Sequence, residues 1–93
     1  MALEDKIRSL PDSPGVYLMK NARSEVIYVG KARSLRSRVM SYFKASSDRD
    51  RLITARIADV ADVDWVVTAT EKEALILENS FIKQFRPRFN VNL

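Results

Sequence analysis

Residues 15–30 decide the fold, and they read Gly15-Val16-Tyr17-Leu18-Met19-Lys20-Asn21-Ala22-Arg23-Ser24-Glu25-Val26-Ile27-Tyr28-Val29-Gly30. Two short runs within this stretch, 15–19 and 26–30, are rich in β-branched and aromatic residues, which predicts two strands. The polar segment 20–25 between them is short enough for a hairpin loop. The stretch therefore predicts an antiparallel pair of strands.

Helices are predicted on both sides of this hairpin. The first covers residues 3–9 and ends before residues 10–14, whose two prolines prevent its continuation. The second covers residues 34–43, where apolar side chains recur at helical spacing. After a polar loop over residues 44–50, a third helix is expected over residues 51–60.

The C-terminal part of the chain predicts one more strand and the clearest helix. Apolar residues alternate over 63–67, as in a strand with one buried face. Thr70 and Glu73 fit a capping box, so the last helix begins after Thr70 and runs to about Arg86, where Pro87 stops it. The order of these elements predicts an α/β (α+β) fold: a small three-stranded, largely antiparallel sheet flanked by helices.

Composition limits the possible chemistry. The 93 residues suit one domain, and nearly half are apolar, which is enough for a single core. No apolar run is long enough for a membrane span, and the charged N-terminus is not a signal peptide, so a cytoplasmic protein without membrane contact is expected. The chain lacks Cys and His, which excludes thiolate or imidazole chemistry. A bound metal must therefore have oxygen ligands, which favours Mg²⁺ or Mn²⁺.

Positive charge is concentrated in the first half of the sequence. Residues 1–44 carry nine Lys/Arg against four Asp/Glu, a balance of +5, whereas residues 45–93 carry seven against eight, a balance of −1. The densest cluster contains four cations and no acid, and consists of Lys31, Arg33, Arg36 and Arg38. Such a cluster predicts nucleic-acid binding through phosphates. A solvated basic helix face is the alternative.

Glu78 interrupts the apolar face of the last helix. At about 100° per residue, five apolar residues fall within about 60° of it around the helix, namely Ala74, Leu75, Phe81, Ile82 and Phe85. A lone carboxylate in the face that should meet the core needs a partner, a metal or a water-filled pocket. A metal site is the functional interpretation, and a buried salt bridge to an arginine is the structural one.

Arg38 is a second such interruption. It falls on the same side of its helix as Val39 and Tyr42, whereas Arg36 points into solvent. If the helical periodicity extends toward the N-terminus as far as Lys31, the Lys31 amine projects from the same face as Arg38. The two cations then predict a phosphate pocket. The alternative is that the aliphatic stems pack on the core while the charged ends reach solvent.

Motifs spread over most of the chain resemble one known family. Gly15-Val16-Tyr17 followed by Tyr28-Val29-Gly30 is similar to the paired motif that names the GIY-YIG nucleases. The similarity continues through further matching segments, namely residues 35–39, 41–43, 73–75, 77–79, 82–84 and 86–90, and covers the chain from about Leu10 to Leu93. It is specific to the branch that acts in bacterial excision repair. Val16, Val29, Phe85 and Phe89 depart from the family pattern, but none is at a proposed catalytic position.

The resemblance implies a role for each of seven residues, and these are Tyr17, Tyr28, Lys31, Arg38, Tyr42, Glu78 and Asn90. Glu78 would be the only protein ligand of one divalent ion, Mg²⁺ or Mn²⁺. Tyr17 would accept the proton of the attacking water, and Arg38 would hold the scissile phosphate. Tyr28, Lys31 and Tyr42 would support the water, the charge or the leaving group, and Asn90 would orient neighbouring groups.

The implied activity is hydrolysis of a DNA phosphodiester bond on the 3′ side of a lesion, after handover from a UvrB-type damage-loading protein. Residues 1–93 would then be a monomeric endonuclease domain excised from the N-terminus of a longer protein. Three alternatives remain: a non-catalytic nucleic-acid-binding module, a different GIY-YIG structure-specific or homing endonuclease, and a protein-interaction domain whose basic face docks an acidic partner.

Overall fold

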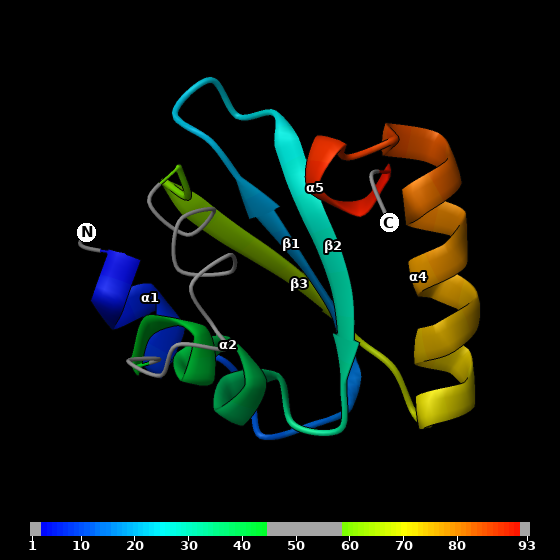
Figure 1. Ribbon diagram of the computed structural model, residues 1–93. Coiled ribbons are helices and arrows are strands. Elements are labelled where there is room, and N and C mark those ends of the chain that lie inside the picture. The colour runs from blue at the N-terminus through cyan, green and yellow to red at the C-terminus, as the bar shows by residue number, and fades with distance from the viewer. Residues whose placement is uncertain (1–2, 45–58, 92–93) are drawn as a thin grey trace.

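The computed structural model describes residues 3–44 and 59–91, and it has one three-stranded sheet with helices on both faces (Figure 1). The strands are β1 (Gly15–Lys20), β2 (Val26–Ala32) and β3 (Asp62–Val67). They lie in the order β2-β1-β3, and both pairings are antiparallel. The predicted fold class is confirmed, and β2 and β3 are edge strands.

Two helices cover one face of the sheet, one helix covers the other, and a short helix lies against the edge strand β2 (Figure 1). Helices α1 (Leu3–Arg8) and α2 (Leu35–Lys44) pack together on the first face. Helix α4 (Glu71–Phe85) lies along the second face, against β2 and β1. The short α5 (Arg88–Val91) folds back onto β2. The helix predicted over residues 51–60 and most of the loop predicted over residues 44–50 lie outside the described residues.

Alternation along the strands divides the core into two parts. The larger part, between the sheet and α1 and α2, is formed by Ile7, Leu10, Tyr17, Met19, Ile27, Leu35, Val39, Tyr42 and Val63. The smaller part, between the sheet and α4, is formed by Val16, Leu18, Val29 and Ala74. Successive strand residues point to opposite faces, so Tyr17 lies on the α2 face while Val16 lies on the α4 face. Trp65, expected in the core, is only partly buried.

Local hydrogen bonds fix where the helices begin. Thr70 is the N-cap of α4 and accepts a hydrogen bond from the amide of Glu73 at 3.1 Å, which confirms that half of the predicted capping box. At the start of α2, the Leu35 amide donates to the Ser13 carbonyl at 3.0 Å. This bond ties the start of α2 to the segment that leads into β1, and it positions the helix that carries Arg38 and Tyr42.

Helix α5 is the element that sequence reasoning missed. The last turn of α4 ends at Arg86, which takes the left-handed conformation with φ 44° while its amide donates to the Ile82 carbonyl. Pro87 follows and is fully buried. The change of direction at Arg86 brings α5 against β2 (Figure 1).

A chain of ion pairs connects α1 to the open edge of β3. Lys6 contacts Asp62 at 2.7 Å and Asp64 at 3.5 Å, and Lys20 of β1 contacts Asp64 from the other side. The hydrogen bond from Lys6 is the main cause that lowers the pKa of Asp62, and the hydrogen bond from Lys20 is the main cause that lowers the pKa of Asp64.

We expect acid to weaken the fold through these two aspartates. Because their pKa values are lower in the folded chain than in the unfolded chain, their contribution is complete above about pH 4 and is lost as the pH falls through the folded values. Both carboxylates are about half exposed, so the contribution is on the order of 1 kcal/mol or less. Thermal unfolding between pH 7 and pH 3 should show a smaller fall in Tm for Asp62→Asn/Asp64→Asn than for wild type. Equal falls in Tm would contradict the assignment.

Candidate active site

Three tyrosines from three different elements form one cluster. Tyr17 comes from β1, Tyr28 from β2 and Tyr42 from α2. The centroid of the Tyr17 ring lies 6.1 Å from that of Tyr28 and 5.9 Å from that of Tyr42, and the centroids of Tyr28 and Tyr42 are 6.4 Å apart. The hydroxyls of Tyr17 and Tyr42 share a buried hydrogen bond of 2.7 Å. The structure therefore brings together three of the predicted site residues.

Gly30 provides the space that Tyr17 occupies. The two residues are directly opposite each other in the β1–β2 register and therefore lie on the same face of the sheet. A Cβ atom on residue 30 would lie 2.3 Å from the Tyr17 hydroxyl and 2.4 Å from its ring carbon, closer than packed atoms approach. Gly30 is therefore required here by a side chain of the neighbouring strand.

Burial keeps Tyr17 and Tyr28 protonated. Burial is the largest cause that raises the pKa of Tyr17 far above its usual value, followed by the nearby Tyr42, and the Arg38 guanidinium opposes this only weakly. Burial, again followed by Tyr42, raises the pKa of Tyr28 to about 12. A neutral Tyr17 hydroxyl can donate or accept a hydrogen bond, but it becomes a proton acceptor only beside additional positive charge.

Arg38 borders the cluster from α2. Its guanidinium carbon lies 5.3 Å from the centroid of the Tyr42 ring, within the range of a cation–π contact. The residue as a whole is exposed. The helical phase therefore correctly placed Arg38 on the side of Tyr42, and its guanidinium remains accessible to an anion from solvent.

Glu78 approaches the same region from α4. Its side chain is half-buried, and it makes no salt bridge with any residue in 3–44 or 59–91. The Glu78 carboxylate is the smallest of the causes that raise the pKa of Tyr28, so the two side chains are close enough to interact electrostatically. The structural alternative, a salt bridge to an arginine, is absent from this part of the chain.

The apolar face around Glu78 is less buried than predicted. Ala74 is buried, and Phe81 and Ile82 pack against the core, as expected. Leu75 and Phe85 were predicted on the same core face, but they are 45% and 42% exposed. The prediction was wrong for these two positions because helical phase does not show where the sheet under the helix ends.

The donors present suit a hard divalent ion held by a single carboxylate. Within the described residues there is no group of three or more His, Cys, Asp or Glu side chains that could enclose a metal. Mg²⁺ keeps several of its waters and often takes only one or two carboxylates from a protein. A half-buried Glu78 without a cationic partner satisfies this requirement.

Lys31 does not lie where the helical phase would place it. Strand β2 continues to Ala32, and α2 begins only at Leu35, so the condition for projecting Lys31 from the helix face is not met. Lys31 is exposed and pairs with Val16, which places it on the α4 face of the sheet, opposite to Tyr17. It therefore lies on the same face as the helix that carries Glu78.

The other two predicted DNA-binding cations are already paired with acids. Arg33 forms a salt bridge with Glu71 at the start of α4. Arg36 lies 3.9 Å from Asp12. Both arginines are exposed, and surface pairs of this kind contribute little energy, so phosphates can replace the carboxylates at low cost.

Asn90 holds the centre of β2 from outside the sheet. Its Nδ2 donates to the Val29 carbonyl at 2.9 Å, and its Oδ1 accepts from the Val29 amide at 2.8 Å. An amide side chain carries one donor and one acceptor group, so it satisfies both backbone groups of an edge residue. Val29 lies between Tyr28 and Gly30 in the chain. Asn90 therefore orients the strand that forms the site, and the sequence gives no local signal of this contact.

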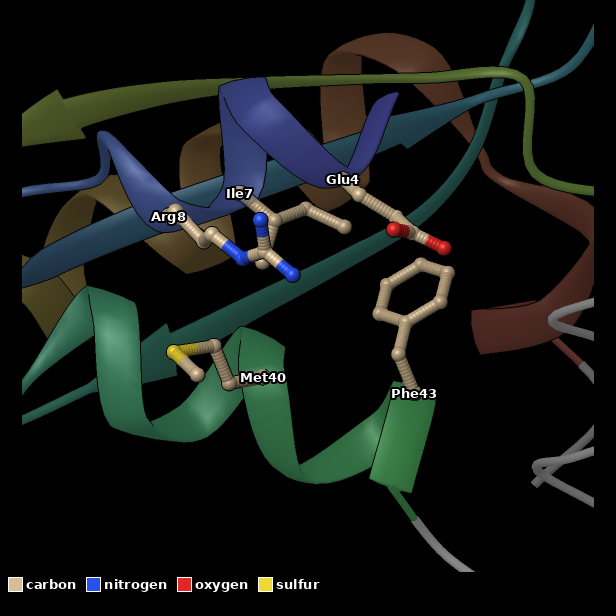
Figure 2. Close-up of a pocket in the computed structure, with 5 residues that line it drawn as sticks. All are labelled: Glu4, Ile7, Arg8, Met40 and Phe43. Carbon is tan, nitrogen blue, oxygen red and sulfur yellow. The ribbon is translucent and has the colours of Figure 1, made fainter. Parts of the chain in front are cut away.

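The described pockets lie away from this cluster. An open cavity of about 220 Å³ between α1 and α2 is lined by Glu4, Ile7, Arg8, Met40 and Phe43. Figure 2 shows Glu4 extending from α1 toward the ring of Phe43 on α2. None of the predicted site residues lines this cavity.

Comparison with known proteins identifies the family. Residues 13–91 match the family model described as the UvrC-like GIY-YIG domain. The chain belongs to this family. It is 55% identical over 93 residues to UvrABC system protein C of Koribacter versatilis and 56% identical over 89 residues to that of Geotalea daltonii. The chain spans about 15% of the length of these relatives. The predicted family is thus confirmed.

Comparison with solved structures gives the same family. The GIY-YIG N-terminal endonuclease domain of UvrC from Thermotoga maritima, bound to its catalytic divalent cation magnesium, has a TM-score of 0.78 and 34% identity. The match covers 94% of this chain and 93% of that one. Similar scores are found for point mutants of that domain, with an asparagine changed to alanine or a tyrosine to phenylalanine, each bound to the catalytic cation. The chain is homologous to the UvrC GIY-YIG endonuclease domain.

Replacing Asn90 should loosen the centre of β2. Asn90→Ala removes both hydrogen bonds to Val29 and should lower the free energy of unfolding by about 1–2 kcal/mol. Asn90→Asp can still accept from the Val29 amide but cannot donate to its carbonyl, so a smaller loss is expected. Amide hydrogen exchange at Val29, measured by NMR, should become faster. Asn79→Ala, an exposed change on α4, is the matched control. Unchanged exchange at Val29 would contradict the proposed contact.

Adding a methyl group at Gly30 should displace Tyr17. Gly30→Ala puts a carbon where the Tyr17 hydroxyl lies, so the hydrogen bond between Tyr17 and Tyr42 should break. Overpacking of this kind costs about 1–3 kcal/mol. Urea unfolding followed by circular dichroism measures the loss, and Ala32→Gly on the same strand is a control without a new clash. Wild-type stability with unchanged tyrosine ring signals in NMR spectra would show that Tyr17 does not require this space.

Proposed function

We propose that this chain is a divalent-metal-dependent DNA endonuclease domain that hydrolyses one phosphodiester bond. The observation that carries the proposal is the position of Glu78. It is a half-buried carboxylate on α4, which covers one face of β2, and it is close enough to Tyr28 to raise its pKa, while Tyr17, Tyr42 and Arg38 lie toward the other face. In the proposed site, the anionic ligand for a cation and the cationic group for a phosphate would come together at the edge of β2.

Glu78 would hold one Mg²⁺ or Mn²⁺, with waters as the remaining ligands. A bound divalent ion of this type neutralises developing negative charge on a phosphate and lowers the pKa of a bound water. The magnesium-bound Thermotoga maritima domain supports this assignment. In that protein the cation is present in each of three tyrosine mutants and one asparagine mutant, which agrees with a carboxylate as the principal protein ligand.

The remaining residues bind the phosphate and manage the proton. Arg38 has an accessible guanidinium whose planar donors suit the oxygens of the scissile phosphate. In its ionised form Tyr17 would take a proton from the attacking water, and the Tyr42 hydroxyl would donate the hydrogen bond that stabilises the phenolate until then. Because burial raises its pKa, Tyr17 serves in this way only while positive charge is bound near it. Tyr28 and Lys31 would orient the water or the leaving group.

The biological role rests on the UvrC relatives, of which this chain spans a small part. We infer that the incision lies on the 3′ side of a lesion in nucleotide excision repair, and that a UvrB-type protein delivers the damaged DNA through the longer protein. The site of action would be the cytoplasm. Arg33, Arg36, Lys31 and Arg38 would contact the DNA backbone. No helix within residues 3–44 and 59–91 has the length and apolar character needed to cross a membrane.

Glu78→Gln should abolish cleavage and leave the fold intact. The amide keeps the shape of the side chain but loses the negative charge that holds the ion, so incision should fall by about 100-fold or more. The assay is metal-dependent nicking of lesion-containing DNA by the longer protein with its partner loaded. Circular dichroism of the 93-residue chain checks the fold, and calorimetry with Mn²⁺ measures the lost metal affinity. Glu73→Gln, an exposed change on the same helix, is the control.

Two results would count against this proposal. Wild-type protein that makes no incision in the loaded complex would favour a non-catalytic DNA-binding module. Full activity of Glu78→Gln would exclude Glu78 as the metal ligand. In either case, calorimetry with Mn²⁺ shows whether the metal site is intact, and circular dichroism shows whether the chain is folded.

A further inference from the structure

Two large apolar side chains on α4 are exposed beside the proposed metal ligand. Leu75 and Phe85 are 45% and 42% exposed. At about 100° per residue, Leu75 lies about 60° from Glu78 around the helix and Phe85 about 20° from it. Along the helix axis, Leu75 is about 4.5 Å before Glu78 and Phe85 about 10.5 Å after it. The two residues therefore lie on either side of Glu78 on the same face of the helix.

A DNA strand that reaches Glu78 must pass over this face. If the scissile phosphate is within reach of an ion on Glu78, the nucleotides next to it fall within about 10 Å of that point, since stacked nucleotides repeat about every 3.4 Å along a strand. Leu75 and Phe85 are within the same distance. Residues 74–82 contain no Lys or Arg, so this part of α4 offers no cation to a phosphate.

Phe85 is held in place by a neighbour that belongs to the core. Its ring centroid lies 5.8 Å from that of Phe81 at an interplanar angle of 41°. Phe81 in turn packs against the buried cluster of Val16, Leu18, Val29 and Ala74. An exposed ring that is braced in this way can receive a nucleobase without first losing side-chain freedom.

We propose that Leu75 and Phe85 form an apolar contact surface for the DNA substrate on both sides of the scissile phosphate. Phe85 stacks on a nucleobase, and Leu75 packs against a deoxyribose. A base inside a duplex is already stacked on both faces, so Phe85 selects DNA in which a base close to the cut is unpaired. This inference rests on the proposed nuclease function and names the part of the substrate that α4 contacts.

The experiment measures binding of the 93-residue chain to a fluorescent oligonucleotide that is duplex on one side of a nick and unpaired on the other, with Ca²⁺ present to limit cleavage. Phe85→Ala should weaken binding by about tenfold, because one base–aromatic stack is lost. The slope of log K against log salt should stay at the wild-type value, because no phosphate contact is removed. Leu75→Ser should weaken binding by a smaller factor, again without a change of slope.

Four further variants separate stacking from other effects. Phe85→Tyr keeps the ring and should restore wild-type affinity, whereas Phe85→Leu keeps an apolar side chain without a ring and should not. Ile76→Ser is the matched control, because Ile76 is 60% exposed but lies about 160° from Glu78 on the opposite side of the helix. Its affinity should be unchanged. Arg38→Ala should lower the salt slope by about 1. Thermal melting of each variant checks the fold. If Phe85→Ala has a lower Tm than wild type, the affinity of Phe85→Leu is used to test the loss of the ring.

The outcomes distinguish the two proposals. If wild type binds and the complex with the longer protein cleaves, yet Phe85→Ala and Phe85→Leu bind as Ile76→Ser does, the apolar surface is not a DNA contact. A changed salt slope in Phe85→Ala would also overturn the inference, because it would mean that a phosphate contact had been lost. If wild type neither binds DNA nor cleaves it, the proposed nuclease function fails first, and the inference fails with it.

Discussion

The site depends on the way the Tyr17 ring lies over a residue without a side chain. Gly30 leaves the space, and the Tyr17 hydroxyl reaches 2.7 Å from that of Tyr42. This one arrangement joins β1, β2 and α2, because the ring comes from the first strand, the space from the second and the hydroxyl partner from the helix. Buried polar groups are costly unless they are hydrogen-bonded, so the two hydroxyls constrain each other. The packing that stabilises the core thus also sets the position of the proposed proton acceptor, Tyr17.

The same burial determines the protonation state of Tyr17 and Tyr28. Removing the tyrosines from water raises the pKa of Tyr17 and Tyr28, and the carboxylate of Glu78 raises the pKa of Tyr28 further. Even with Arg38 nearby, the two phenols stay protonated and cannot act as bases until further positive charge is bound. In the proposed site, a divalent ion on Glu78 would reverse the sign of the nearest charge and so favour an ionised tyrosine. The proposed proton transfer to Tyr17 would therefore be coupled to metal binding.

Much of the fold could be predicted because its signals are local. The β-branched and aromatic runs in residues 15–30 predicted β1 and β2 to within two residues, and Thr70 predicted the start of α4. Glu78 was found because a charge within an apolar helix face is visible in one sequence. The remaining features depend on contacts between distant segments. Helix α5 has four residues, too few for a periodic pattern, and the bond from Asn90 to Val29 spans 61 positions. Lys31 was misplaced because helical phase was carried into a strand.

The edge position of β2 gives the residues of the proposed site a way to come together from the two faces of the sheet. In the middle of a sheet, backbone hydrogen bonds on both sides would separate a group under α4 from a group under α2. At an edge strand, side chains from the two faces can approach each other around the free side of the backbone. An exposed edge carries unpaired amide and carbonyl groups that attract other strands. Asn90 satisfies these groups at Val29 with a side chain in place of a neighbouring strand, so the edge stays open beside Tyr28 while its backbone remains paired. A fourth strand at this position would satisfy the same groups but would close the path between Glu78 and Arg38.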